Sequence, residues 1–121
     1  VVELKVENVI ILGHGQCGGI RALVSRLHSD SDSFVERWVA IARPALFRAV
    51  AANPEANQDQ LCQLCEMEAI KISLENLRTF PFVKKAEKER GMNIVGAYFD
   101  LEGGRLLELI EATGEFVSLN V

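Results

Sequence analysis

Runs of apolar and polar residues along the chain predict a strand, a set of helices and a late hairpin. Residues 9–12 form a short, mostly β-branched apolar run that ends at Gly13, which predicts a strand buried on both faces, as in a parallel sheet. A loop with four glycines follows at 13–19. Apolar residues at helical spacing then predict a helix from Ile20 to about His28.

The middle of the chain predicts two helical segments separated by a proline. Ser33 and Glu36 fit a capping box, so a helix should begin there, and we expect its Trp38 to lie in the core or at a subunit interface. The apolar face of this helix would consist of Phe34, Trp38, Ile41 and Ala42. Pro44 should break or kink the helix, and helical spacing resumes over 45–52.

The longest helical pattern extends from Asn57 to about Phe80, where Pro81 should stop it. Its apolar face, over residues 61–77, is so broad that we expect this helix to be buried between other elements. A short amphipathic helix over 82–90 should follow and end at Gly91.

Strand patterns return near the end of the chain. Residues 93–101 and 105–110 predict a hairpin around the turn signal at 102–104, and 116–119 could add an edge strand. The predicted fold class is therefore α/β: a mostly parallel central sheet flanked by helices, with the late hairpin at its edge.

Length and composition limit the possible classes of protein. The 121 residues suit a single domain over 1–121, and 49% hydrophobic with 25% charged residues excludes a disordered chain. No apolar run approaches the roughly 18 residues of a membrane span, so we expect no membrane partner. The net charge of −4 without a basic cluster argues against nucleic-acid binding. The first residue is Val, which suggests part of a longer protein.

The chain has three cysteines, an odd number that makes no disulfide framework and favours a reducing, cytoplasmic location. Cys62 and Cys65 form a Cys-x-x-Cys inside a predicted helix. A metal or redox role is open for this pair, but buried packing is the favoured interpretation, above all for Cys65. His28 at a helix end and Asp100 at a strand end are more typical of solvated positions than of catalytic ones.

His14 and Cys17 are the strongest candidates for chemistry. They lie three residues apart in the glycine-rich loop after the first strand, and ligands gather at the carboxyl ends of strands in open α/β sheets. Imidazole and thiolate are both donors that zinc prefers. By itself the pair could also be an incidental histidine and a free cysteine in a strand-to-helix turn.

The surrounding motifs resemble those of the β-class carbonic anhydrases. Residues 13–20 resemble a strand ending in Gly-His-x-x-Cys-Gly-Gly, and 65–77 resemble a helix with Glu-x-x-Ala-Val-x-x-Ser-Leu-x-Asn-Leu. Residues 79–83 are similar to Thr-x-Pro-Phe-Val, and 96–100 to a late Gly-x-x-Tyr-Asp strand with one position shifted or substituted. The stretch 34–38 falls where the family has an aromatic-rich helix.

The resemblance implies zinc as cofactor, His14 and Cys17 as two of its ligands, and reversible hydration of carbon dioxide to bicarbonate. The backbone amide of Gly18 would donate to the zinc-bound oxygen or to bicarbonate, and a homo-oligomer, a dimer or a multiple of dimers, is expected. The family's Cys-x-Asp-x-Arg motif, which supplies a further zinc ligand and the Asp/Arg dyad, does not occur in this sequence.

Because that motif does not occur, the chain corresponds to the carboxyl-terminal part of such a domain. We expect it to carry no catalytic dyad residue and to be inactive or nearly so by itself. Two alternatives remain open: a truncated or degenerate non-catalytic member that serves as an assembly or regulatory subunit, and a hydrolase of carbon disulfide or carbonyl sulfide on the same scaffold.

Overall fold

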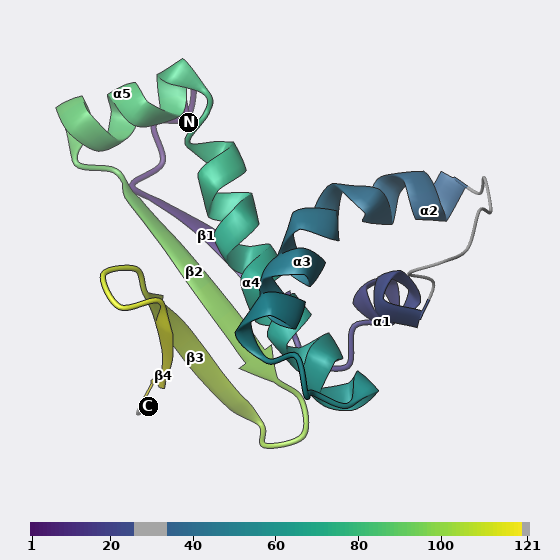
Figure 1. Ribbon diagram of the computed structural model, residues 1–121. Coiled ribbons are helices and arrows are strands. Elements are labelled where there is room, and N and C mark those ends of the chain that lie inside the picture. The colour runs from purple at the N-terminus through teal and green to yellow at the C-terminus, as the bar shows by residue number, and fades with distance from the viewer. Residues whose placement is uncertain (26–33, 120–121) are drawn as a thin grey trace.

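The computed structural model describes residues 1–25 and 34–119. Its elements, in chain order, are β1 (Asn8–His14), α1 (Gly18–Ser25), α2 (Phe34–Val39), the 3₁₀ turn η1 (Ala40–Ala42), α3 (Arg43–Ala52), α4 (Gln58–Leu77), α5 (Pro81–Arg90), β2 (Asn93–Asp100), β3 (Arg105–Ile110) and β4 (Glu115–Ser118) (Figure 1). Among the described residues, no helix combines the length and apolar composition that crossing a bilayer requires.

The strands form one sheet in the order β1-β2-β3-β4. β1 pairs with β2 in parallel, from Asn8 opposite Asn93 to His14 opposite Phe99, whereas β2–β3 and β3–β4 are antiparallel. The α/β class, the late hairpin and the edge strand are thus confirmed, but the sheet is mixed rather than mostly parallel. Tight turns join β2 to β3 and β3 to β4 and force antiparallel pairing, while the helices connect β1 to β2.

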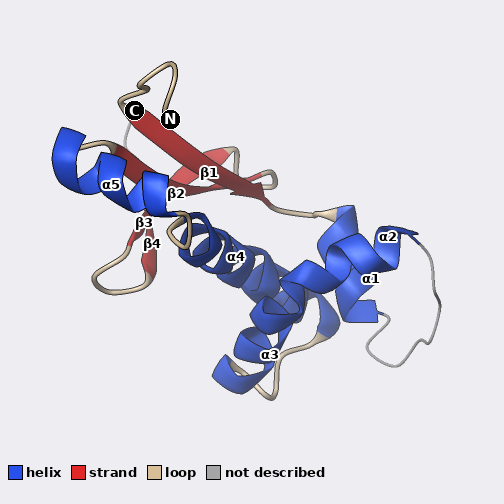
Figure 2. Ribbon diagram, turned by 90° about the horizontal axis from the view of Figure 1, so that it is seen from above, coloured by secondary structure: helices blue, strands red, loops and turns tan. Residues whose placement is uncertain are grey.

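The prediction that the first strand is buried on both faces is wrong for this chain. Ile10 and Leu12 are 63% and 61% exposed, whereas the alternate residues Val9 and Ile11 are partly buried in the core. β1 is an edge strand among the described residues, and α4 lies along one side of the sheet (Figure 2). The face that carries Ile10 and Leu12 therefore has no helix of the described chain packed against it.

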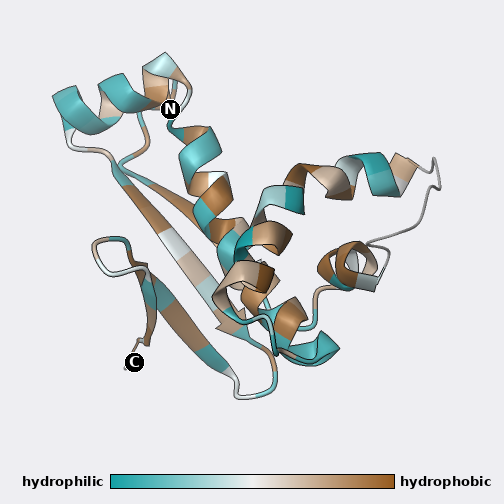
Figure 3. Ribbon diagram, viewed as in Figure 1, coloured by the Kyte–Doolittle hydropathy of each residue, from teal (hydrophilic) through white to brown (hydrophobic). Residues whose placement is uncertain are grey.

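Helix α4 lies at the centre of the molecule and separates two hydrophobic clusters. One cluster joins it to α1 and α3 through residues such as Leu23, Leu46 and Cys65, and the other joins it to the sheet and α5 through residues such as Ile70 and Tyr98. Apolar residues recur along α4, while α5 is mostly hydrophilic (Figure 3). The predicted burial of the 57–80 helix between other elements is confirmed.

Two glycines let α4 approach the sheet closely. A Cβ atom added at Gly13 would lie 2.7 Å from Ile70 Cδ1, and one added at Gly96 would lie 2.9 Å from Leu74 Cδ1. Side chains of α4 therefore press directly against the backbone of β1 and β2. This packing brings Glu66, one turn before Ile70, to the carboxyl end of β1, where the glycine-rich loop begins.

Local sequence signals set the start of α4 and the end of α5 as predicted, whereas α4 ends at Leu77, before the expected stop at Pro81, and Pro81 instead begins α5. The Asn57 side chain accepts from the Gln60 amide in a capping box at the start of α4, and Gly91 ends α5 with φ 64°. Pro44 lies in the first turn of α3, so the helical pattern is broken there by the η1 turn.

Most of the apolar face predicted for the 34–42 helix lies outside the core of this chain, although Ala42 packs against the cluster around α4. Phe34 is 93% and Trp38 is 73% exposed, so the core placement of Trp38 is wrong, while its placement at a subunit interface stays a prediction. Ser33 of the predicted capping box and His28 lie outside the described residues.

Candidate functional site

The loop between β1 and α1 holds both predicted metal ligands. His14 is the last residue of β1, and Cys17 directly precedes α1, where its carbonyl accepts from the Arg21 amide at 2.9 Å. Between them the Gly15 amide donates to the Phe99 carbonyl at 2.9 Å, and Gln16 has φ 54°, in the left-handed region. The loop is therefore a tight turn fixed to the end of β2.

The hydrogen bond of the His14 side chain defines which ring nitrogen could bind a metal. The Nδ1 atom of His14 lies 2.8 Å from the Gly15 carbonyl oxygen. A carbonyl oxygen only accepts hydrogen bonds, so Nδ1 must carry a proton, and in the neutral imidazole this tautomer leaves the lone pair on Nε2. Such a hydrogen bond from the remote ring nitrogen is the usual way in which proteins orient a metal-binding histidine.

Cys17 is a half-buried free thiol at the N-terminus of α1. Its Sγ lies 3.8 Å from the position of a Cβ atom added at Gly19, so the sulfur lies over the first turn of the helix. Gly18 is the first residue of α1 and has no atom within 4 Å of its added Cβ. The first amides of a helix have no acceptor within it, and the Gly18 N–H is one of these amides.

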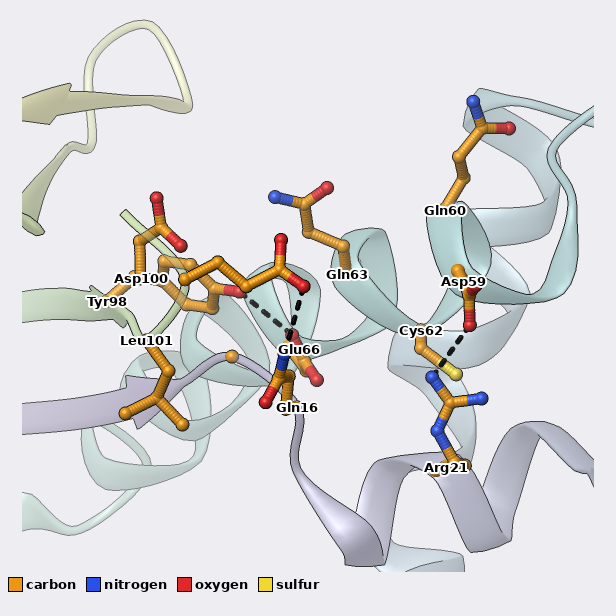
Figure 4. A pocket seen from close by; sticks show the side chains of 12 residues that line it. Gln16, Arg21, Asp59, Gln60, Cys62, Gln63, Glu66, Tyr98, Asp100 and Leu101 are labelled. Atoms are coloured by element: carbon orange, nitrogen blue, oxygen red, sulfur yellow. Dashed lines mark hydrogen bonds and ion pairs between the residues drawn. The ribbon is translucent and has the colours of Figure 1, made fainter. Parts of the chain in front are cut away.

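Glu66 of α4 ties this loop to the rest of the site. Its side chain is the one charged group in the core of the described chain, in a residue that is only 5% exposed. Oε1 accepts from the Cys17 amide at 2.9 Å, and Oε2 accepts from the Tyr98 hydroxyl at 2.9 Å. Figure 4 shows the Tyr98 hydroxyl meeting Glu66 across the site. Burial, together with the hydrogen bond to Glu66, raises the pKa of the Tyr98 phenol.

The sequence analysis assigned no role to Glu66, although the residue lies in the motif that carried the resemblance. One signal could have identified it: an acidic residue within the broad apolar face of the 61–77 helix. Burying a carboxylate is costly unless hydrogen bonds satisfy it, so such a position indicates specific partners.

A polar pocket of about 600 Å³ opens beside Glu66. It lies between the glycine-rich loop, the start of α4 and the β2–β3 turn, and Arg21 donates to Asp59 at 2.8 Å along its wall (Figure 4). Asp100, the last residue of β2, holds the turn: it accepts from the Gly103 amide and from Arg105, which lower the pKa of its carboxyl. These partners give Asp100 a structural role in the turn, in place of the solvated position expected from the sequence.

Cys62 and Cys65 lie on α4 and are packed in the hydrophobic core, which is the interpretation favoured from the sequence. Both are buried, and burial raises the pKa of the Cys65 thiol to about 12. Within the described ranges, no three His, Cys, Asp or Glu side chains come together as a group that could hold a metal ion. That finding argues against a closed site built from Cys62, Cys65, His14 and Cys17.

Comparison with known proteins shows which family the sequence of this chain matches. The family model described as carbonic anhydrase matches residues 1–106. A curated relative, β-carbonic anhydrase 6, mitochondrial, of Arabidopsis thaliana, is 39% identical over 103 residues.

The chain belongs to the β-carbonic anhydrase family. Among solved structures, the β-carbonic anhydrase CcaA is 25% identical with a TM-score of 0.80, covering 99% of this chain and 54% of that one. Tetrameric β-carbonic anhydrases from Sordaria macrospora match with 22% identity and a TM-score of 0.77, covering 91% of this chain and 55% of that one, which shows the shared fold.

The β-carbonic anhydrase chain described here spans only part of its relatives. The Arabidopsis match covers 84% of this chain but 36% of the relative, and the solved chains are covered by about half.

The number of possible zinc ligands in this chain agrees with its partial coverage of the relatives. The imidazole and thiol of the glycine-rich loop are donors that zinc prefers, and the His14 tautomer is the correct one. A catalytic zinc site needs three protein ligands, so the two in this chain fit zinc as part of a larger set.

Proposed function

We propose that this protein catalyses the zinc-dependent, reversible hydration of carbon dioxide to bicarbonate and a proton. His14 Nε2 and Cys17 Sγ would hold zinc together with a ligand from outside the described residues. The observation that carries the proposal is the Nδ1 hydrogen bond of His14, which leaves Nε2 as the nitrogen that could bind a metal, in the loop that also holds Cys17 directly before α1. Membership of the carbonic anhydrase family supports the same reaction.

The residues of this chain would bind and orient rather than transfer protons. When bound, zinc supplies a Lewis acid that makes water a nucleophile at neutral pH. The Gly18 amide, at the start of α1, would donate to a bicarbonate oxygen, since helix N-termini favour anions. The Glu66 carboxylate holds the Cys17 backbone, and thereby the thiol, in place.

Activity requires more than this chain provides. Residues 1–121 would form the carboxyl-terminal part of one domain, and the Asp/Arg dyad and further ligand would come from a Cys-x-Asp-x-Arg motif elsewhere in the protein. The coverage of about a third to a half of the relatives' lengths supports this assignment. We therefore expect the 121-residue chain alone to hydrate carbon dioxide very slowly.

The protein would work as a homo-oligomer, a dimer or a multiple of dimers. Phe34, Trp38 and Phe47 expose large apolar side chains on α2 and α3, and Ile10 and Leu12 do so on β1. Exposed apolar groups of this size are typical of surfaces that meet another protein. The Sordaria relatives, which share the fold, are described as tetrameric.

A cytoplasmic location remains part of the proposal. All three cysteines are free thiols, which suits a reducing compartment. The Arabidopsis relative is named mitochondrial, so fluorescence microscopy of a tagged protein at its natural length is the direct test. Signal confined to an organelle would exclude the cytoplasm.

The test is zinc quantitation combined with stopped-flow hydration of carbon dioxide, on the protein at its natural length. Wild type should carry close to one zinc per chain, and His14→Ala and Cys17→Ser should lose both zinc and at least 100-fold in rate. Cys62→Ala, a buried cysteine on α4, is the matched control and should keep both. Full activity in both loop variants would refute the assignment.

The same measurements separate the alternatives. A folded wild-type protein without zinc and without hydration activity would favour the non-catalytic assembly or regulatory subunit. One observation favours this outcome: the described residues contain no group of three His, Cys, Asp or Glu side chains that could hold a metal ion. Zinc together with faster turnover of carbonyl sulfide or carbon disulfide than of carbon dioxide would favour the hydrolase.

A further inference from the structure

We propose that Glu66 is a positioning residue of the metal site, which fixes Cys17 by joining the ligand loop to α4 and β2 at once. The inference rests on the proposed function, because it takes Cys17 as a zinc ligand. It goes beyond that function by assigning a role to a residue that would not touch zinc, water or carbon dioxide.

The geometry of the carboxylate carries the proposal. Its two oxygens bind two different elements: Oε1 accepts from the Cys17 amide and Oε2 from the Tyr98 hydroxyl, each at 2.9 Å. Glu66 itself belongs to α4, so one side chain connects the loop, the central helix and the strand β2. Figure 4 shows the contact between Glu66 and Tyr98. The distance to the Cys17 amide is typical of an N–H bond to a carboxylate, and the distance to the Tyr98 hydroxyl lies at the long end of the range for O–H···O bonds.

The position of Glu66 in the core indicates that the carboxylate serves a specific purpose. The residue is only 5% exposed and lies one turn before Ile70, in a helix whose other buried side chains are apolar or thiols. A buried carboxylate contributes less to stability than a well-packed apolar side chain of similar size. The Glu66 carboxylate therefore serves to position its two hydrogen-bond partners, and one of these is the backbone amide of Cys17, a proposed zinc ligand.

The conformation of the ligand loop depends on hydrogen bonds to other elements of the chain. Gln16 holds a left-handed conformation that non-glycine residues rarely adopt, and it is maintained by surrounding bonds. The Gly15 amide binds the Phe99 carbonyl, and the Gln16 side chain donates to Glu102 at 2.9 Å, but both of these contacts lead to the β2 end of the site. Among the hydrogen bonds described for the loop, the one from the Cys17 amide to Glu66 leads to α4.

Tyr98 of β2 contacts the ligand loop and is the second hydrogen-bond partner of Glu66. A Cβ atom added at Gly15 would lie 2.9 Å from the Tyr98 hydroxyl oxygen, so the phenol lies directly against the loop. The hydroxyl holds Glu66 Oε2, which directs Oε1 toward Cys17. Removing this hydroxyl should therefore loosen Glu66 without removing its bond to the Cys17 amide.

The experiment measures metal affinity and geometry in the protein at its natural length. Zinc dissociation constants come from competition with a chelator, and the absorption of the cobalt-substituted protein reports the metal–thiolate bond of Cys17. The variants are Glu66→Ala, Glu66→Gln and Tyr98→Phe. The matched control is Glu75→Gln, which removes a carboxylate from the same helix at the exposed ion pair with Arg48.

We expect Glu66→Ala to weaken zinc binding by about 10- to 100-fold, the usual effect of removing a group that supports a metal ligand. Its thiolate-to-cobalt absorption at saturating metal should also change. Glu66→Gln should recover most of the affinity, because the amide oxygen can accept from Cys17 while its N–H₂ donates to the Tyr98 oxygen. Tyr98→Phe should fall between wild type and Glu66→Ala, and Glu75→Gln should match wild type.

The possible failures are distinguishable. A wild-type protein that binds no zinc would end the proposed function itself. Wild-type zinc affinity and cobalt absorption in Glu66→Ala, with only a lower melting temperature, would show a purely structural role and overturn this inference alone. If Glu66→Ala does not fold, unchanged affinity in Tyr98→Phe overturns it instead.

Discussion

Gly13 and Ile70 lie so close that a methyl group added at Gly13 would stand 2.7 Å from the Ile70 Cδ1 atom. Ile70 has little room to move, since it is 2% exposed and its Cγ2 atom lies 3.0 Å from an added Cβ at Gly96. The glycine in the family motif is thus a packing requirement at this position. It sets the distance between β1 and α4, and with it the position of the ligand loop.

The first prediction concerns this contact. Gly13→Ala should destabilise the protein by about 1–3 kcal/mol in urea unfolding, the usual cost of overpacking a core. Ile70→Ala in the same chain should relieve part of the clash, so the two effects should not add. Gly18→Ala is the control: it has open space and a helical position, and it should leave stability unchanged or slightly higher.

The second prediction concerns Arg78 at the end of α4. Its guanidinium binds Glu87 of α5 at 3.2 Å and also pairs with Glu111, which follows β3, and both carboxylates raise the pKa of Arg78. Arg78→Met keeps the aliphatic stem but leaves both carboxylates without their partner. We expect a loss of about 1–3 kcal/mol in urea unfolding, because hydrogen bonds to charged groups are among the stronger ones.

Salt dependence provides the check on that mechanism. The difference between wild type and Arg78→Met should shrink in 1 M salt, since ion pairs at partly exposed sites are screened. The exposed pair between Lys85 and Glu89 is the comparison, and Lys85→Met should change stability little. An equal loss at both positions would show that the Arg78 network has no special role.

The third prediction is a pH dependence at the β2–β3 turn. The Gly103 amide and the Arg105 guanidinium lower the pKa of Asp100 in the folded protein. A depressed folded pKa stabilises the fold above the unfolded value near 3.9, and this contribution is lost as pH falls through the folded value.

Asp100→Asn tests that dependence. We expect the variant to be less stable than wild type at pH 6, and the difference to vanish toward pH 2. Urea unfolding at a series of pH values measures this convergence. Because Asn can still accept from the Gly103 amide, the difference reports mainly the charge facing Arg105, and a difference that stays constant down to pH 2 would contradict the assignment.

The fourth prediction concerns thiol reactivity. Burial raises the pKa of Cys65 to about 12 and also raises the pKa of Cys62, whereas Cys17 is half-buried. Iodoacetamide at pH 8 should therefore modify Cys17 well before the other two, because the thiolate is the reactive form. Peptide mass spectrometry measures the order, and added zinc should protect Cys17. Modification of Cys65 at the same rate would mean that α4 is not packed as described.

The sequence alone determined the features that depend on neighbours along the chain. Asn57, Pro44, Pro81 and Gly91 set helix ends through caps and backbone geometry that act within a single turn. The Gly-His-x-x-Cys-Gly-Gly loop was also identified from sequence, because the candidate donors and their glycines are only a few residues apart.

Only the tertiary structure decided the features that depend on distant partners. The exposure of Ile10 and Leu12 and the mixed sheet follow from which strands meet, which no short-range pattern encodes. Glu66 binds groups 49 and 32 residues away along the chain. An acidic residue in an apolar helix face acquires its role when packing removes water and brings those two donors to its oxygens.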